Sequence, residues 1–502
     1  QAIDEDSDGD QESLGTHNAT VPKPTKKPKG AYQVHKPISV GIKIVSAIPG
    51  VLDQMPYEMH VGEDVSEWFL QRLLEIQTMC IQYLFDEKRM VMMADDVAAH
   101  AAAITCYICD KPFDDRKPDH KVRDHDHISG AYRGAAHNSC NLLKRRQRKI
   151  PVFIHNFRGY DSHLIVSALG IHKDQELKVI AQTMEKYLQL EFSNHIVFKD
   201  SLQFLSAKLD RLTQNLLSSG RDNFVHLLNE FKDRSDADID LLLRKGVYPY
   251  DYMDNATKFE ETDLPPREAF FSRLTQEECS VENYKHAKKV WDTFGCQSLK
   301  DYHDLYLKCD VLQLADIFET FRTTAMSEYR LDPAHYVSAP HLSWDAMLRS
   351  TRCKLDLLSD NAMFTMIHQN LRGGVAMISK RHGQANNKYM KAHYDPSKPS
   401  KYLMYIDANN LYGWSMSQPL PDSKFEWLQE SEWQNIDWLA QTEDQEDGYI
   451  VECDLDYPDN LHDSHSDYPL APERLVVKAE LLSAKQQEQK EAYNTKASST
   501  AF

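Results

Sequence analysis

The stretch KIPVFIHNFRGYD, residues 149–161, is the clearest structural signal in the middle of the chain. Its first half is an apolar run, which predicts a strand. Its second half carries Asn156, Tyr160 and Asp161. The stretch therefore predicts a strand that ends in polar side chains able to form a site, although this pattern alone is a weak signal. Similar apolar patterns on either side predict strands over residues 32–45, 194–205 and 401–407, and helices over residues 65–85 and 301–322.

A block rich in cysteine and histidine precedes this stretch: CYICDKPFDDRKPDHKVRDHDHISGAYRGAAHNSCN, residues 106–141. Cys106 and Cys109 have the Cys-x-x-Cys spacing that lets two thiolates share one metal, and His137 and Cys140 repeat it. Two such pairs framing a polar segment predict a closed Cys3His zinc site. A metal would also stabilise a segment that has few apolar groups of its own.

Residues 124–127 of this block read Asp-His-Asp-His and are not needed for that zinc, and Asn141 directly follows the last cysteine. This arrangement resembles the ββα-metal nucleases of the recombination endonuclease VII type. The resemblance implies that Asp124 and Asn141 hold Mg²⁺ and that His125 is the general base that activates water. His137 departs from the family, which usually has cysteine there. The alternative is a zinc-stabilised module that binds DNA or braces the fold without cleaving.

A cluster of basic residues follows at once in LLKRRQRKI, residues 142–150. A run of charge is usually a solvated surface. Here it is the densest positive cluster of an acidic chain and adjoins the predicted phosphate site, so we expect it to contact the DNA backbone. A nuclear-import signal is the alternative. The basic residues are Lys144, Arg145, Arg146, Arg148 and Lys149.

Two downstream segments carry further candidate site residues. In YLKCD, Tyr306 and Asp310 are four positions apart and so share one face of the predicted helix. A tyrosine hydroxyl beside a carboxylate can orient a metal-bound water, whereas the alternative for Tyr306 is an aromatic side chain of the core. In YIDANNLYGW, Asp407 ends the predicted strand and Tyr412 follows five residues later.

In this order the segments resemble family B DNA polymerases of the protein-primed type, found in viruses, organellar plasmids and self-synthesising transposons. The resemblance covers about residues 32–480. It implies an α/β multidomain chain with an RNase H-like 3′–5′ exonuclease fold, a small zinc-stabilised ββα-metal insertion and the start of a polymerase palm. The implied divisions are a disordered acidic tail (1–30), the N-terminal part of the exonuclease domain (31–100), the insertion (101–150), the exonuclease domain (151–330), the exonuclease–polymerase connection (331–400) and a partial palm (401–502).

The resemblance also implies roles for residues of the exonuclease half. Asp161 matches the second exonuclease motif, and Tyr306 with Asp310 matches the third, whose carboxylates hold catalytic metals. Ser201 and Leu202 match a motif that grips the single-stranded 3′ end, and Asn156 would contact DNA.

In the polymerase half, the resemblance implies that Asp407 holds the metals that bind the triphosphate of the incoming nucleotide. Tyr412 would stack under its sugar. Arg372, Gly373 and Gly374 match the linker motif, whose glycines let the backbone approach the template.

The sequence also departs from this family. It has no Asp-x-Glu on a first apolar strand, no Asp-Thr-Asp, and no Lys-x-x-x-Asn-Ser-x-Tyr-Gly helix. We therefore expect the chain to be incomplete at both ends and, as given, to add no nucleotides.

The composition limits which partners the protein can bind and in which cellular compartment we expect it. The net charge of −18 excludes non-specific coating of nucleic acid, so DNA contact needs local basic patches. No run approaches the roughly 18 apolar residues of a membrane span. Nine cysteines favour a reducing compartment, the nucleus or the cytoplasm.

The expected partners are DNA, deoxynucleoside triphosphates and a terminal priming protein, with structural Zn²⁺ and catalytic Mg²⁺. The alternative functions are a non-catalytic, zinc-dependent DNA-binding remnant and a stand-alone Mg²⁺-dependent endonuclease.

Overall fold

A computed structural model describes most of the chain from residue 35 onward. The described residues are 35–46, 50, 52, 55–85, 88–114, 119–143, 149–170, 175–183, 186–371, 376–465, 467–468, 470, 473–475, 478, 480, 482–493 and 499–501. Several predicted features lie outside them, namely the tail at residues 1–30, the basic residues Lys144, Arg145, Arg146 and Arg148, and the linker residues Arg372, Gly373 and Gly374.

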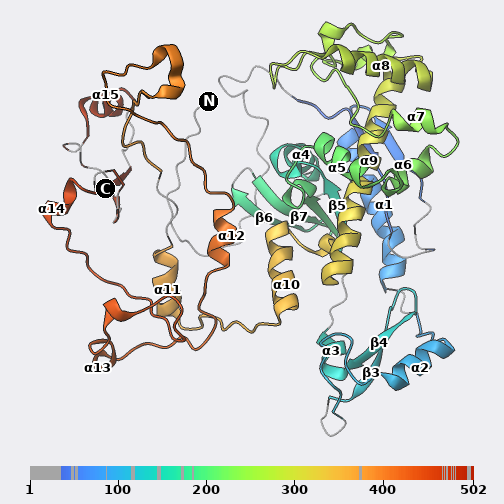
Figure 1. The fold of residues 1–502 in the computed structure, drawn as a ribbon. Coiled ribbons are helices and arrows are strands. Elements are labelled where there is room, and N and C mark those ends of the chain that lie inside the picture. The colour runs from blue at the N-terminus through green and yellow to red at the C-terminus, as the bar shows by residue number, and fades with distance from the viewer. Residues whose placement is uncertain are drawn as a thin grey trace. The chain divides into compact units, whose positions relative to one another are not determined.

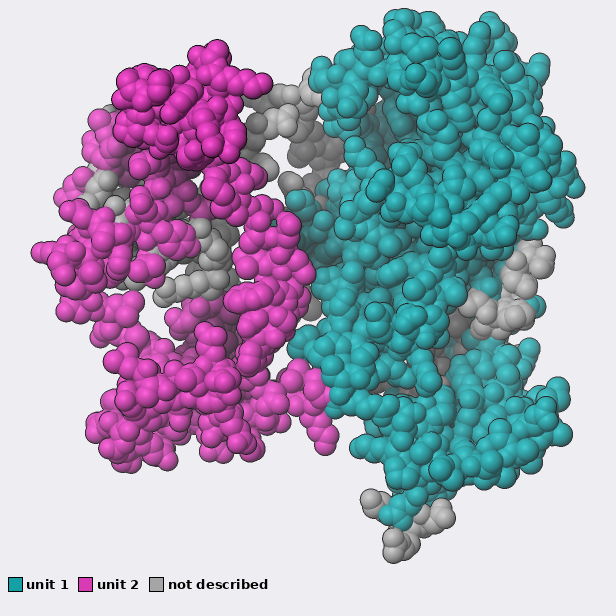
Figure 2. Space-filling view, viewed as in Figure 1, with its two compact units in different colours: residues 1–352 teal, residues 353–502 magenta. Residues whose placement is uncertain are grey.

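The chain forms two compact units, residues 1–352 and 353–502, which are coloured separately in Figure 2. The N-terminal unit is mixed α/β, as predicted, and contains a four-stranded sheet in the order β5-β8-β7-β6. The strands are β5 (Ile150–Ile154), β6 (Leu177–Thr183), β7 (Lys186–Phe192) and β8 (Ile196–Asp200). β5 runs parallel to β8, whereas the other pairs are antiparallel. The strand predicted from residues 149–161 is therefore confirmed, and it lies at one edge of this sheet.

The sheet is covered by α1 (Val65–Phe85) and α4 (Asp161–Leu169), which pack against each other. α1 has the bounds that its apolar spacing predicts. Leu70, Phe157 and Phe198 are wholly buried in the cluster between these helices and the sheet. Burial of this apolar surface stabilises the region that carries residues 156–161.

The long helix α9 (Leu299–Tyr329) contains the predicted helix over residues 301–322. It begins with a capping box, in which the Ser298 side chain accepts the N–H of Asp301 and the Asp301 carboxylate accepts the N–H of Ser298. α9 contributes to two further apolar clusters, one with α5 (Leu209–Ser219) and α6 (Val225–Glu230), the other with α8 (Val281–Phe294). In Figure 1 it is the long yellow helix.

Residues 88–143 form a small module of their own. An antiparallel hairpin is followed directly by a short helix, in the strand–strand–helix order that the resemblance to ββα-metal nucleases implies (Figure 1). The elements are α2 (Ala94–Ala102), β3 (Lys121–His125), β4 (Tyr132–His137) and α3 (Asn138–Leu143). The remaining elements of the N-terminal unit are the antiparallel pair β1 (Ser39–Ile42) and β2 (Glu58–Val61), α7 (Asp236–Asp240) and α10 (Ala339–Thr351).

The C-terminal unit is made of short elements. They are α11 (Asn361–Gln369), α12 (Leu411–Met416), α13 (Glu430–Trp433), α14 (Asp459–His462), α15 (Ala484–Tyr493) and the antiparallel pair β9 (Glu473–Leu475) and β10 (Ser499–Ala501). Asn387 is the one buried residue among those of this unit whose burial is described.

The prediction of a strand over residues 401–407 is wrong. Lys401 forms an isolated bridge to Asn386, and residues 402–407 have no regular structure. The physical reason is pairing: an extended segment becomes a strand only beside a neighbour, and Tyr405 and Ile406 are 98% and 77% exposed. Separately, none of the described helices combines the length and apolar character needed to span a bilayer.

Candidate metal centres and nucleic-acid site

The four predicted zinc ligands converge. One donor atom from each of Cys106, Cys109, His137 and Cys140 lies within 4.8 Å of all the others. Sγ of Cys109 is 3.4 Å from Nδ1 of His137, and Sγ of Cys140 is 4.0 Å from the same atom. Three thiols and one imidazole are a donor set that suits tetrahedral zinc. The side chains fit the ion, and zinc binding itself stays a prediction.

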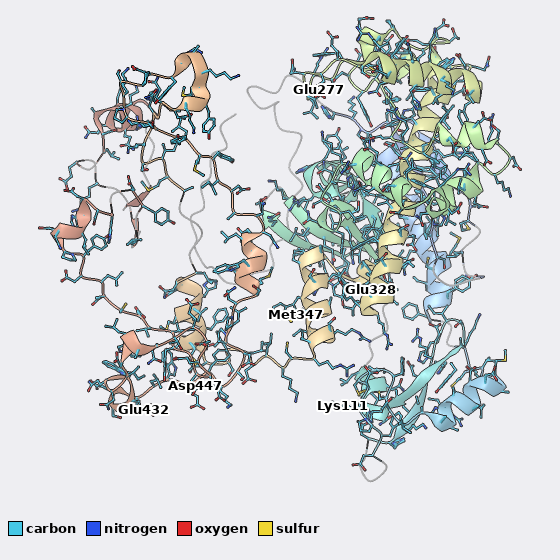
Figure 3. All side chains as sticks on the ribbon, in the orientation of Figure 1. Lys111, Glu277, Glu328, Met347, Glu432 and Asp447 are labelled. Atoms are coloured by element: carbon cyan, nitrogen blue, oxygen red, sulfur yellow. The ribbon has the colours of Figure 1, made fainter. Side chains whose placement is uncertain are left out.

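The first cysteine pair lies on a tight knuckle. The Cys106 N–H donates to the carbonyl of Lys111, which is labelled in Figure 3, and the Asp110 N–H donates to the carbonyl of Cys106. The His137 N–H points at Sγ of Cys106, at 3.3 Å. Burial raises the pKa of Cys106, but backbone N–H donors including Cys109 and His137 more than offset it and bring the pKa to about 7. A thiol with this pKa gives up its proton readily to a metal.

The predicted nuclease residues lie in the same module. Asp124 is buried near the end of β3, at a register shift next to His125, and its carboxylate accepts a hydrogen bond from the Tyr107 hydroxyl. Asn141 lies on α3, which packs against β3 and β4. Asp124 and Asn141 are among the residues that line a large cleft of about 1670 Å³, which also includes Asp161, whereas His125 is not among its lining residues. The His125 ring packs on that of His127, with centroids 4.5 Å apart.

Asp126, the second aspartate of the Asp-His-Asp-His run, stabilises the hairpin through contacts with nearby residues. One carboxylate oxygen accepts the N–H groups of Ile128 and Ser129, each at 2.8 Å, and the other pairs with Arg133. These contacts close the turn between β3 and β4. Asp126 therefore shapes the hairpin that presents Asp124 and His125.

The loop after β5 is held by Asp200, a residue that the sequence reasoning missed. Asp200 is wholly buried and accepts the N–H groups of Asn156 (2.8 Å), Leu202 (2.9 Å) and Arg158 (3.1 Å). Asn156 takes a left-handed conformation with φ of 67°, which costs energy that such hydrogen bonds offset. The available signal was the position of Asp200 at the end of the neighbouring parallel strand.

Asp161 begins α4 directly after this loop. Burial, and then the nearby Asp200 carboxylate, raise the pKa of Asp161 to about 6. A carboxyl group with a raised pKa, lining a cleft, is a candidate for function on physical grounds. Asp161 is therefore placed where a divalent cation would relieve the cost of its charge.

Ser201 and Leu202 form a single 3₁₀ turn (Ser201–Gln203) after β8. The Ser201 hydroxyl is buried and lies 3.0 Å from Nδ1 of His155, whose Nε2 lies 3.1 Å from the carbonyl of Ala207. Ser201 thus stabilises the turn through its buried contact with His155, while Leu202 is only partly buried. Contact with DNA by these two residues stays a prediction.

Asp310 and Tyr306 lie on α9 within a polar and aromatic cluster. Nζ of Lys245 is 2.7 Å from Oδ2 of Asp310, whereas Oδ1 of Asp310 is buried and has no hydrogen-bond partner among the described residues. The Tyr306 hydroxyl bonds to that of Tyr250, and the Tyr248 ring stacks on Tyr306 with centroids 4.7 Å apart. The sequence reasoning missed Lys245 and Tyr250, although Lys-Gly-Val-Tyr-Pro-Tyr is a compact basic and aromatic run.

His155 lies close enough to both Asp200 and Asp310 to be affected by their charges. Burial lowers the pKa of His155, and the Asp200 and Asp310 carboxylates both oppose that effect. A metal shared by Asp161 and Asp310, which the two exonuclease motifs imply, stays a prediction.

The polymerase residues lie in the C-terminal unit. Asp407 is exposed and precedes a turn in which Asn410 is left-handed. Tyr412 lies on α12 with 88% of its surface exposed. Lys149, the described member of the basic cluster, pairs with Glu191 and donates to the carbonyl of Asn194 at 2.7 Å. It therefore helps to fix β5 beside the turn after β7.

Comparison with known proteins adds one match. The family described as DNA polymerase type B, organellar and viral, matches residues 141–496, about seven-tenths of the chain. No curated protein and no solved structure matches. The matched range contains Asp161, Asp310 and Asp407, whereas the four zinc ligands precede it. The chain belongs to the organellar and viral type B DNA polymerases.

Proposed function

We propose that the protein is a protein-primed DNA polymerase of a viral or mobile-element type, with a 3′–5′ exonuclease half and an endonuclease VII-like zinc module. The observation that carries the proposal is the family match over residues 141–496, which includes Asp161, Asp310 and Asp407. DNA and deoxynucleoside triphosphates are the partners of such a polymerase. A terminal priming protein and a role in replicating the element complete the proposal.

For the exonuclease half, the proposal rests on Asp161 and Asp310. The raised pKa of Asp161 and the unpartnered Oδ1 of Asp310 fit a bound cation. Burial disfavours the negative charge of each carboxylate, and a metal would offset that cost. Mg²⁺, when bound, would supply positive charge against the scissile phosphate. Lys245 holds Asp310 in place through its ion pair, and Leu202 and Asn156 would position the single-stranded 3′ end.

For the zinc module, the proposal assigns DNA cleavage to the hairpin and α3. Asp124 and Asn141 would hold Mg²⁺, and His125 would take a proton from the attacking water. The support is the strand–strand–helix order, the convergence of the zinc donors and the shared cleft of Asp124 and Asn141. The implied RNase H-like fold, the domain boundaries and a nuclear or cytoplasmic location belong to the same proposal.

In the C-terminal unit, Asp407 would hold the metals at the triphosphate and Tyr412 would stack under the sugar. Both side chains are accessible, which such contacts require.

Nicking of supercoiled plasmid tests the zinc module. Purified protein should convert the plasmid to open circles in Mg²⁺ and not in a chelator, and His125→Ala should abolish nicking while the zinc content is unchanged. Equal loss of zinc and nicking would mean that His125 is structural. Plasmid binding without nicking by the unmodified protein would favour the alternative of a non-catalytic DNA-binding module.

Binding of a single-stranded 3′ end tests the exonuclease half. Fluorescence anisotropy in Ca²⁺, which limits cleavage, should show weaker binding by Leu202→Ala and Asp310→Asn. Leu274→Ala is the matched control, because Leu274 is 93% exposed and distant from the motif in sequence. Equal affinity of all the variants would count against the exonuclease assignment.

A further inference from the structure

Tyr107 connects the predicted zinc knuckle to the β3–β4 hairpin. It lies between Cys106 and Cys109 in the sequence Cys-Tyr-Ile-Cys, so two zinc ligands flank it within two positions. Its N–H donates to the carbonyl of Ala135 on β4 at 3.0 Å. The backbone of the knuckle is therefore fastened to the hairpin at Tyr107.

The Tyr107 ring lies across the hairpin at Gly134. A Cβ built on Gly134 would lie 2.8 Å from Cδ1 of the ring, closer than such atoms approach, and Gly134 has a φ of 156°. Glycine at position 134 is thus what allows the Tyr107 side chain to lie this close to the strand. Gly134 is the register partner of Asp124, so the ring crosses from the knuckle toward the proposed nuclease carboxylate.

The Tyr107 hydroxyl donates a hydrogen bond to Oδ2 of Asp124. Asp124 is only 4% exposed, and both residues line the same cleft as Asn141. A buried carboxylate that ligates a metal is commonly oriented by a second hydrogen bond of this kind, and loss of such a partner typically costs about 10- to 100-fold in metal affinity. The hydroxyl therefore holds one oxygen of Asp124 and fixes the direction of the other.

We propose that Tyr107 is a positioning residue through which zinc occupancy of the knuckle sets the affinity of Asp124 for a divalent cation. Zinc fixes the Cys-Tyr-Ile-Cys turn, the turn fixes the ring on Gly134, and the hydroxyl fixes the carboxylate. This inference rests on the proposed endonuclease function of the module. It makes zinc a control on the second metal site as well as a stabiliser of the fold.

The test uses Mn²⁺ as the probe and Tyr107→Phe as the variant, in the full chain. Zinc content is measured by colorimetric metal analysis, and Mn²⁺ binding by titration calorimetry, with the site of interest defined as the one lost in Asp124→Ala. Tyr107→Phe should keep its zinc and bind Mn²⁺ at that site about 10-fold or more weakly. Tyr132→Phe is the matched control: it removes a hydroxyl of the same module that lies 2.9 Å from Nδ1 of His100, and should bind Mn²⁺ normally.

A second variant tests the link to zinc. Cys109→Ser should lose zinc and weaken Mn²⁺ binding at the Asp124 site, and adding Tyr107→Phe should then weaken it no further. Absence of the Asp124-dependent Mn²⁺ site from the unmodified protein would refute the proposed endonuclease function itself. Normal Mn²⁺ affinity of Tyr107→Phe, additive effects of the two changes, or loss of zinc from Tyr107→Phe would each overturn the coupling alone.

Discussion

The ammonium of Lys245 lies 2.7 Å from Oδ2 of Asp310 and joins the segment before α8 to the middle of α9. The two side chains are 29% and 18% exposed, so the pair is partly withdrawn from water. The other carboxylate oxygen has no hydrogen-bond partner among the described residues. Lys245 is therefore the main compensation for the charge of Asp310 in the metal-free protein.

Removal of that ammonium should destabilise the protein. Lys245→Met keeps the apolar stem and leaves the Asp310 charge uncompensated, which we expect to cost about 2 kcal/mol, less than the roughly 3–5 kcal/mol of a wholly buried pair. Urea denaturation followed by tryptophan fluorescence measures the change. The double variant Lys245→Met/Asp310→Asn should recover part of the loss.

The matched control is Lys178→Met, which breaks a pair with Glu176 in the same unit whose side chains are 57% and 51% exposed. It should cost about 0.5 kcal/mol or less. A similar decrease in the free energy of unfolding in the two single variants would show that other groups compensate the Asp310 charge.

Gly246 should tolerate no side chain. A Cβ at this position would lie 2.6 Å from Cδ2 of Tyr306, so Gly246→Ala must move the ring that bonds to Tyr250. We expect a loss of about 1–3 kcal/mol from overpacking, measured as a lower melting temperature. Gly170→Ala is the control, because its nearest neighbour would be 3.7 Å away and its φ is −60°. A melting temperature of Gly246→Ala equal to that of the control would mean that the ring moves freely.

Zinc should be lost with any one of its thiol ligands. Metal analysis should find one zinc per chain in the unmodified protein and none in Cys106→Ser, because Cys106 is wholly buried at the site. Binding of a structural zinc contributes about 10–16 kcal/mol in isolated fingers, so amide hydrogens of residues 119–143 should exchange much faster in the variant. Cys353→Ser, at an exposed cysteine, should change neither quantity. Full zinc content in Cys106→Ser would refute the ligand set.

Asp316 should contribute stability that is lost as pH rises toward neutrality. Burial raises the pKa of Asp316 to about 7, with Glu319 adding to the effect, although the N–H groups of His226 and Leu227 and the nearby Lys43 oppose it. An aspartate of the unfolded chain titrates near about 3.9. Between about pH 4 and pH 7 the folded protein therefore holds a proton on Asp316 that the unfolded chain has released, and the contribution of Asp316 to the free energy of unfolding decreases with rising pH.

Melting temperatures between pH 4.5 and pH 8 measure this effect. Asp316→Asn removes this negative contribution, so the slope of melting temperature against pH should become more positive than in the unmodified protein. Asp210→Asn, at an aspartate that bonds to Gln214 on the exposed side of α5, serves as the control and should leave the slope unchanged. An unaltered slope in Asp316→Asn would assign the pH dependence to other groups.

Local patterns predicted much of the N-terminal unit. The apolar spacing of residues 65–85 gives α1 its bounds, and the apolar run of residues 150–154 forms β5. The paired Cys-x-x-Cys and His-x-x-Cys spacings predicted the convergence of their side chains, because each pair is a local turn and a hairpin joins the two.

Local sequence patterns could not predict the contacts between residues that are far apart in the sequence. Asp200 and Lys245 act on residues more than forty positions away, and nothing in their own neighbourhood in the sequence specifies the partner. The strand predicted at residues 401–407 failed for the same kind of reason, since strand formation depends on a neighbour that the segment itself does not encode.

The course of α9 has a consequence for how the chain folds during synthesis. The apolar cluster that holds Leu70, Phe157 and Phe198 is built from residues 69–198, so it can close before α9 leaves the ribosome. The clusters that contain Leu312 and Leu299 both include side chains of α9. The apolar side chains of residues 205–298 that belong to these clusters therefore cannot be fully buried until α9 has been synthesised. Domains fold in the order in which their parts emerge. The stretch between β8 and α9 therefore stays without its apolar partners for longer than the sheet and α1 do in the nascent N-terminal unit.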